Sequence, residues 1–229
     1  RINALAPEIE ALSHQLIDAF PDAPFDLIRA YAQPIPIHVI CWLLGAPVGM
    51  ADQLLAWSND MVAMYQARRT QEIEHAAAKA SAEFTAFMRD YIDERRKKPA
   101  DDLITELIAA EEDGTRLSTD EMITTCILLL NAGHEATVHT MGNGVKTLLE
   151  HGADPSWLTP DAIEGTVEEI LRYDPPLHVF TRYAYEDIEI AGHTFQRGDE
   201  VALMLAAAGR DPKQWEEPNK FIPTRPVVT

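Results

Sequence analysis

Cysteine is scarce in this sequence of 229 residues, and acidic residues greatly outnumber basic ones. The two cysteines, Cys41 and Cys126, lie far apart in apolar surroundings. This predicts buried free thiols in a reducing compartment rather than a disulfide. There are 19 Lys and Arg against 37 Asp and Glu, for a net charge of −18. Because phosphate binding needs clustered basic side chains, this balance argues against a nucleic-acid partner.

Long apolar runs, repeats and low-complexity tracts are also missing. No stretch approaches the length that spans a bilayer and no signal peptide is present, so we expect a cytoplasmic protein without a membrane partner. Hydrophobic residues make up 46% of the chain, enough for the core of one domain, 1–229. The chain starts with Arg1 instead of methionine and ends at Thr229 without a capping feature, so we expect an interior portion of a longer protein.

Apolar residues at helical spacing dominate the first three quarters of the chain. They predict helices over 1–20, 37–44, 51–67, 70–96, 101–110, 118–151 and 160–174. Short β-like segments follow at 179–185, 188–191, 194–195 and 201–205. The predicted fold class is therefore mainly α, with an α+β layout and a small late antiparallel sheet.

Prolines, glycines and charges predict where several of these helices end. Pro34 and Pro36 should interrupt a helix that opens near Phe25, and Gly45 should cap the segment after them. Thr159 and Pro160 should begin the helix that follows them, and Asp113-Gly114 should form a turn. The densest basic cluster, Arg95 to Lys98, ends a helical pattern, which indicates a solvated helix end.

The helix predicted from Ser118 to about His151 organises the chain. Ser118 and Glu121 form a capping box, and the rod would be roughly 50 Å long. In its middle, an apolar run leads into Gly133 and Glu135. A mid-helix glycine costs about 1 kcal/mol relative to alanine. Gly133 could therefore admit a ligand or only pack closely, and Glu135 could carry protons or only face water.

A zinc site is one alternative for this helix. His134-Glu135 followed by His139 resembles the helical metalloprotease motif, which needs histidines four residues apart. Here they are five apart, or roughly 140° around the helix, so the two ligands would diverge.

In the helix before Pro175, Glu169 and Arg172 are three residues apart and can meet on one face. Such a pair is usually exposed and contributes little to stability. Apolar neighbours at 167, 170 and 171 favour a buried pair instead, and a buried Arg needs several acceptors.

Taken together and in this order, the motifs resemble the cytochrome P-450 family of haem-thiolate monooxygenases, in its soluble bacterial branch. The resemblance rests on Ala-Gly-His-Glu at 132–135, Glu-Ile-Leu-Arg at 169–172, Arg182 to Gly192, Arg210-Asp211-Pro212, and Phe221 to Arg225. The segments Phe25-Asp26-Leu27 and Leu43 to Pro47 fit the same pattern.

The resemblance implies a role for each of several residues. Ala132 and Gly133 would lie over a haem, Glu135 would belong to the acid relay, and Arg182 would hold a haem propionate. A buried ion triad would consist of Glu169, Arg172 and Arg225, and Leu177, His178, Val179 and Phe180 would line the substrate pocket.

The sequence also departs from the family pattern. The family usually has threonine directly after the relay acid, where this chain has Ala136, and the hydroxyl comes one residue later, at Thr137. One residue is a rotation of about 100° along a helix. Proton delivery would then rely on water, on a substrate hydroxyl or on a distorted helix. The family's cysteine ligand to the iron is expected beyond Thr229, since neither Cys41 nor Cys126 has the matching place.

The resemblance thus implies a haem enzyme that inserts one oxygen atom from O2 into a small or medium-sized apolar organic substrate. Ferredoxin and ferredoxin reductase would deliver the electrons. The alternative is a truncated, non-catalytic relative or binding module that cannot ligate haem by itself.

Overall fold

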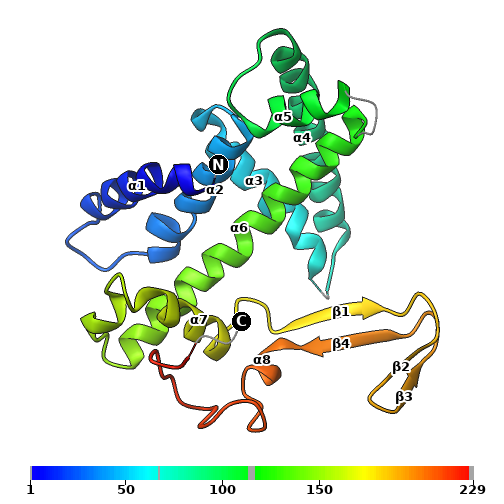
Figure 1. The fold of residues 1–229 in the computed structure, drawn as a ribbon. Coiled ribbons are helices and arrows are strands. Elements are labelled where there is room, and N and C mark those ends of the chain that lie inside the picture. The colour runs from blue at the N-terminus through cyan, green and yellow to red at the C-terminus, as the bar shows by residue number, and fades with distance from the viewer. Residues whose placement is uncertain (1, 67, 113–116, 227–229) are drawn as a thin grey trace. The chain divides into compact units, whose positions relative to one another are not determined.

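The computed structural model describes residues 2–66, 68–112 and 117–226 (Figure 1). The chain divides into two compact units, Arg1–Val138 and His139–Thr229, and each is described by itself. Within the described residues, strands occur only after α7 (Ile163–Tyr173), and helices form most of the rest. The expected mainly α fold with late antiparallel strands is therefore confirmed. The turn predicted at Asp113-Gly114 lies outside the described residues.

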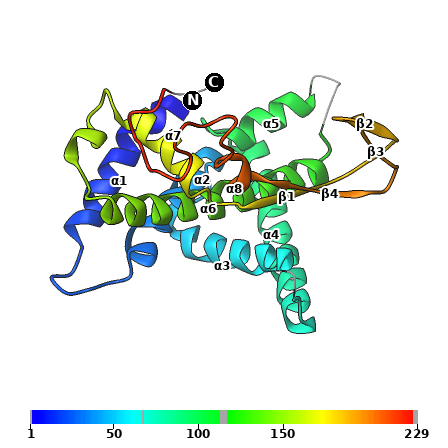
Figure 2. The same ribbon diagram turned by 90° about the horizontal axis from the view of Figure 1, so that it is seen from below.

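Unit 1 is helical. It contains α1 (Ala6–Asp18), α2 (Pro34–Leu44), α3 (Ala51–Val62), α4 (Gln71–Lys97), α5 (Leu103–Glu112) and most of α6 (Thr119–Glu150). A 3₁₀ segment at Ile2–Leu5 precedes α1. A π-helical turn at Ile28–Ala32 and 3₁₀ segments at Val48–Met50 and Ala63–Tyr65 lie between the later helices. α3 and α4 pack along each other, and both can be followed in Figure 2.

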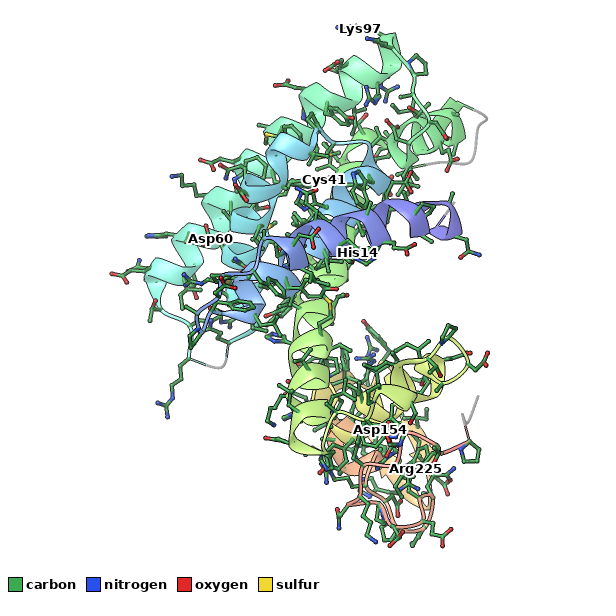
Figure 3. The ribbon with its side chains drawn as sticks, turned by 90° about the vertical axis from the view of Figure 1, so that its left-hand side faces the viewer. His14, Cys41, Asp60, Lys97, Asp154 and Arg225 are labelled. Atoms are coloured by element: carbon green, nitrogen blue, oxygen red, sulfur yellow. The ribbon has the colours of Figure 1, made fainter. Side chains whose placement is uncertain are left out.

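The core of unit 1 takes apolar side chains from α2 to α6. Trp57 packs edge-on against Phe84, with ring centroids 5.8 Å apart, and its indole N–H donates to Glu83 at 2.9 Å. Cys41 and Cys126 are fully buried in this core and free, which confirms the prediction of two free thiols. Figure 3 marks Cys41 among the packed helices of the unit.

The proline expectations are confirmed only in part. The helical segment that opens near Phe25 does end before Pro34, with the π-helical turn Ile28–Ala32, but α2 already begins at Pro34 and not at Ile37, and both prolines lie in its first turn. The first N–H groups of a helix have no intrahelical acceptor, so proline removes no hydrogen bond there. The later helix begins at Ile163, not at Pro160. A turn precedes it, in which the Thr159 carbonyl accepts from the N–H groups of Ala162 and Ile163.

The predicted caps of α2 and α6 are confirmed. Gly45 ends α2 with a φ of 71°, and its N–H donates to the Trp42 carbonyl. At the start of α6, the Ser118 N–H donates to the Glu121 carboxylate at 2.7 Å, and the Glu121 N–H donates to the Ser118 hydroxyl at 3.3 Å. These bonds from Ser118 lower the pKa of the exposed Glu121 carboxyl. α6 then continues for 32 residues.

The basic end of α4 is not simply solvated, contrary to expectation. Arg95 donates to the Asp102 carboxylate at 2.6 Å and to the Gly45 carbonyl at 3.2 Å. The Tyr91 hydroxyl donates to the same carbonyl. Asp102 is buried, and its second oxygen accepts from the Thr105 N–H in the first turn of α5. This network connects the end of α2 with α4 and α5.

Unit 2 contains the end of α6, a 3₁₀ segment at Pro155–Leu158, α7, α8 (Leu205–Ala208) and two antiparallel strand pairs. β1 (Val179–Tyr183) pairs with β4 (Glu200–Met204), and β2 (Ile188–Ile190) pairs with β3 (His193–Phe195). α6 and α7 approach closely at Gly144, where an added Cβ would lie 3.2 Å from Ile170 Cδ1. Among the helices of the described residues, none has both the length and the apolar character needed to cross a bilayer.

Replacing Gly45 tests the network at the end of α2. Alanine at this position must adopt a left-handed φ, and its Cβ would lie within 2.6 Å of Asp102 Cγ. We expect Gly45→Ala to lower the free energy of unfolding by more than the roughly 1–2 kcal/mol that left-handed strain alone costs. Urea titration followed by circular dichroism measures the loss.

Gly152→Ala is the matched control, because Gly152 also has a positive φ, 92°, but among the described residues no atom beyond its chain neighbours lies within 4 Å of its added Cβ. Equal losses for the two variants would show that the contact with Asp102 adds nothing to the strain.

Candidate functional site

The candidate catalytic segment, residues 132–137, lies in the part of α6 that belongs to unit 1. The α-helix is uninterrupted here, so it is not deformed at Gly133. Gly133 lies against α2, where an added Cβ would be 3.3 Å from Ile40 Cδ1, closer than ordinary packing. Close approach of the two helices is therefore one function of this glycine, and Ala132 beside it is exposed.

The two groups that could handle protons differ in their surroundings. Glu135 is partly buried, whereas Thr137 is exposed and its hydroxyl donates to the Gly133 carbonyl at 3.1 Å. Ala136, between them, has no hydroxyl. Because the helix is regular, Thr137 keeps its rotation of about 100° from position 136. The Thr137 hydroxyl proton is thus engaged in a hydrogen bond to the backbone carbonyl one helical turn earlier.

Regularity of the helix also keeps His134 and His139 apart. With no bulge between them, they retain the divergence of roughly 140° that a helix imposes. Among the residues that the structure describes, no three His, Cys, Asp or Glu side chains are grouped to hold a metal ion.

In unit 2, Glu169 and Arg172 of α7 form a buried ion pair. Arg172 Nε donates to Glu169 Oε2 at 2.6 Å, and Nη2 donates to Oε1 at 2.8 Å. The two residues are 3% and 8% exposed. Arg225 Nε donates to Glu169 Oε1 at 3.3 Å, and the Ile222 N–H donates to the same oxygen at 2.6 Å. Both Glu169 oxygens are therefore hydrogen-bonded.

Arg172 also holds the irregular segment that follows α8. Its guanidinium donates to the carbonyls of Gly209, Pro218 and Lys220 at 2.6 to 2.8 Å. Gly209 is so close that an added Cβ would overlap the carbonyl oxygen of Arg172. One buried side chain thus fixes three points of a segment without regular structure. Figure 3 marks Arg225 near the end of this segment.

An open cleft of about 500 Å³ lies beside this network within unit 2. Its walls include all three charged side chains, Glu169, Arg172 and Arg225, together with Leu205 and Trp215. Arg172 lies 5.5 Å from the Trp215 ring centroid, within cation–π distance.

Arg182 lies on β1 opposite Val201 and is exposed. Its guanidinium donates to the adjacent Thr181 carbonyl at 2.9 Å and lies 5.0 Å from the Phe180 ring centroid. Side chains alternate along a strand, so Phe180 and Arg182 share one face and Val179 lies on the other. The side chains before Arg182, at 177 to 180, are all exposed.

The two cysteines are poor candidates for a thiolate ligand. Burial raises the pKa of the Cys41 thiol to about 11 and that of Cys126 to about 12. The residues of this chain therefore match only part of the haem site that the resemblance implies. Arg182 offers an exposed guanidinium for a haem propionate, whereas neither cysteine can supply the iron ligand.

Sequence reasoning missed two polar features of unit 1. One is the buried Arg95–Asp102 pair, which could not be recognised because Arg95 belongs to a run of basic residues. The available signal was Asp102 directly before a helix, the position of an N-cap. The other is Asn131, whose side-chain oxygen is buried without a hydrogen-bond partner among the described residues. An amide directly after the apolar run 127–130 was the available signal.

Comparison with known proteins supplies the family. The sequence matches the family model described as Cytochrome P450 over residues 43–152 and 162–228. It is 39% identical to vitamin D(3) 25-hydroxylase of Pseudonocardia autotrophica and 36% identical to 6-deoxyerythronolide B hydroxylase of Saccharopolyspora erythraea. Each alignment covers 98% of this chain and 55% of the relative. The chain thus spans about half the length of these curated relatives.

Comparison of the fold with solved structures also identifies the cytochrome P450 family. The crystal structure of P450BioI in complex with hexadec-9Z-enoic acid ligated acyl carrier protein superposes with a TM-score of 0.90 at 32% sequence identity. The match covers 98% of this chain and 59% of the P450BioI chain.

Replacing Arg172 tests the ion network. Arg172→Ala leaves Glu169 buried with the longer bond to Arg225 as its only contact to a cation, beside the bond from the Ile222 N–H, so we expect a loss of about 3–5 kcal/mol in the free energy of unfolding. Arg29→Ala is the control: its partner is Asp26 at 3.5 Å, and their side chains are 84% and 57% exposed. A loss of at most about 1 kcal/mol is expected there. Denaturant titration compares the two, and similar small losses would mean that the buried network is not stabilising.

Thiol labelling tests the burial of the cysteines. At pH 8 the raised pKa values leave roughly one thiol in a thousand as thiolate at Cys41 and one in ten thousand at Cys126. We expect both to react with a disulfide reagent at least about a hundredfold more slowly in the native protein than in urea. The variants Cys41→Ala and Cys126→Ala assign the two phases, and rapid native labelling of either thiol would contradict its burial.

Proposed function

Because the chain belongs to the cytochrome P450 family, we propose that the whole protein is a haem-dependent monooxygenase. It would insert one oxygen atom from O2 into a small or medium-sized apolar organic substrate. The observation that carries the proposal is the family match, which includes α6 with its 132–135 segment and α7 with its buried ion network. The two units would belong to one domain over 1–229.

Haem is the cofactor of this family, and when bound it supplies the redox-active iron at which O2 is reduced. In this chain, Arg182 would hold a propionate through its planar guanidinium, and Ala132 and Gly133 would border the haem. The iron ligand would be a cysteine that follows Thr229 in the whole protein. Electrons would come from NAD(P)H through ferredoxin reductase and ferredoxin, in the cytoplasm.

Glu135 would move protons at its carboxylate oxygens. Its partial burial in α6 supports this role, because a proton carrier must be reachable from water and from the reaction cavity. With Ala136 in place of a hydroxyl residue and the Thr137 hydroxyl bonded to Gly133, water or a hydroxyl of the substrate would complete the route.

Glu169, Arg172 and Arg225 would hold the fold around the haem rather than react. The burial of Glu169 and Arg172 and the bonds that both arginines donate to backbone carbonyls support a structural role. Leu177 to Phe180 would contribute to the substrate pocket, and their exposed, largely apolar side chains support this. The first compounds to screen are those for which two relatives are named, vitamin D(3) and 6-deoxyerythronolide B.

The alternative is a non-catalytic binding protein with the same fold. The burial of both cysteines favours it if the whole protein contains no further cysteine. The haem content of the purified whole protein and the Soret band of its reduced carbonyl complex decide between them. A protein that takes up no haem would refute the monooxygenase proposal.

Replacing Glu135 tests the proton step in the whole protein. Glu135→Gln keeps the shape of the side chain but cannot exchange a proton, so we expect turnover to fall by about a hundredfold or more. The Soret band of the reduced carbonyl complex should be unchanged. Product formation and peroxide release measure the effect, and Glu150→Gln, at an exposed position of the same helix, is the control. Unchanged turnover in Glu135→Gln would remove this residue from the mechanism.

A further inference from the structure

Two other segments of unit 2 supply hydrogen-bond donors to the end of α7. The Tyr173 carbonyl accepts from Arg210 Nη2 at 2.8 Å, and the Asp174 carbonyl accepts from the Asn143 carboxamide of α6 at 3.1 Å. Carbonyl groups at the C-terminal end of a helix have no donor within the helix itself. Asn143 therefore completes the cap of α7 from a different helix.

The residues after this cap have little with which to hold their own position. Pro175-Pro176 has no N–H group, so it cannot donate a backbone hydrogen bond. Further along, the His178 carbonyl accepts from the Ala206 N–H at 3.3 Å, and the pairing of β1 with β4 starts at Val179. The connection between α7 and β1 is thus held at one end by the bond to the α7 cap and at the other end by the strand pair.

Lys146, three residues after Asn143 on α6, contacts the same residue in a different way. Its ammonium lies 3.4 Å from the Asp174 carboxylate, and the Lys146 side chain is 60% exposed. Ion pairs as exposed as this one contribute little. The partly buried carboxamide of Asn143 binds the backbone of Asp174 instead, so loss of that bond affects the course of the chain itself.

The chain that leaves this cap enters segment 177–180 within three residues, and the proposed function assigns that segment to the substrate pocket. Leu177, Val179 and Phe180 are 39%, 44% and 40% exposed, so their side chains are available to a ligand. The geometry of a site depends on the residues behind it that hold its lining side chains, and displacements of about 1 Å can be costly. The bond from Asn143 has the place of such a support.

We propose that Asn143 is a positioning residue: by holding the Asp174 carbonyl, its carboxamide fixes where segment 177–180 lies and so determines which large ligands fit the pocket. This inference rests on the proposed function and adds a determinant of ligand size that does not touch the ligand. Without the bond the segment samples more positions, and a ligand that contacts it must order it again on binding, which lowers the apparent affinity. A ligand too small to reach the segment is not affected.

The test uses the haem-loaded whole protein and three probes: imidazole, 1-phenylimidazole and 1-dodecylimidazole. Each can bind the haem iron through a ring nitrogen, and the two larger probes also extend away from it. Titrations of the Soret band give the dissociation constants. Asn143→Leu replaces the carboxamide with an apolar group of similar size. It should weaken at least one larger probe about three- to tenfold, as expected for one neutral hydrogen bond, and change imidazole by less than about twofold.

Hydrogen exchange of backbone amides in the same protein reports the position of the segment directly. Peptides that cover 177–180 should exchange about three- to tenfold faster in Asn143→Leu, whereas peptides that cover β2 and β3 should not change. If Asn143→Leu does not load haem, Asn143→Ala takes its place, since it removes the carboxamide without adding bulk.

Two control variants should match the unmodified protein in both measurements. Lys146→Gln removes only the exposed ion pair with the Asp174 carboxylate. Asn59→Leu makes the same amide-to-leucine change at an exposed position of α3.

The possible outcomes are distinct. Unchanged exchange of 177–180, or a rise that is equal in β2 and β3, overturns the proposal. Faster exchange with an unchanged ratio of larger probe to imidazole also overturns it, because the position of the segment then does not determine which ligands fit. Equal weakening of all three probes indicates a general loss at the haem site and overturns it as well.

A closed pocket gives a different pair of results. If neither larger probe binds the unmodified protein, binding that appears only in Asn143→Leu supports the proposal, and continued absence of binding overturns it. A whole protein without a Soret band would refute the proposed function itself, whereas a loaded protein that fails these tests refutes only this inference.

Discussion

A carboxylate removed from water must be surrounded by donors, and Glu169 is the clearest case in this protein. It is 3% exposed and accepts from two guanidinium groups and one backbone N–H. Arg172, its main partner, uses its remaining donors on carbonyls of an irregular segment. Such a segment has no ladder of its own, so its backbone groups need partners from elsewhere. The buried Glu169–Arg172 pair supplies these hydrogen-bond partners, so the structure of unit 2 depends on it.

Unit 1 contains a similar but smaller hydrogen-bond network, centred on Arg95. The Gly45 carbonyl, left without an intrahelical donor at the end of α2, accepts from Arg95 and Tyr91, and Arg95 is neutralised by the buried Asp102. A helix end, a cation and an anion from three helices satisfy one another. In both units, therefore, arginine with its several fixed donors connects backbone carbonyls to a buried acid, a task that lysine would perform less well.

The α6 segment differs from these networks, because a buried polar atom in it has no hydrogen-bond partner among the described residues. Gly133 allows α2 to approach, and Thr137 is bonded to the backbone, but the Asn131 oxygen has no partner among the described residues. The contrast with the fully bonded network around Glu169 separates the part of the chain that maintains the fold from the part that we assign to chemistry.

The sequence alone determined what depends on a few neighbouring residues. The capping box at Ser118, the left-handed cap at Gly45 and the fold class followed from local hydrogen bonding, backbone freedom and periodicity. The first residue of α2 did not follow from the local sequence, because proline is compatible with the first turn of a helix as well as with the interruption of a helix. Only the tertiary structure decided which distant groups meet: Arg225 reaches Glu169 across 56 residues, and Arg95 is drawn from solvent to a buried acid. Such contacts depend on how whole helices pack, and neither spacing nor composition records that packing.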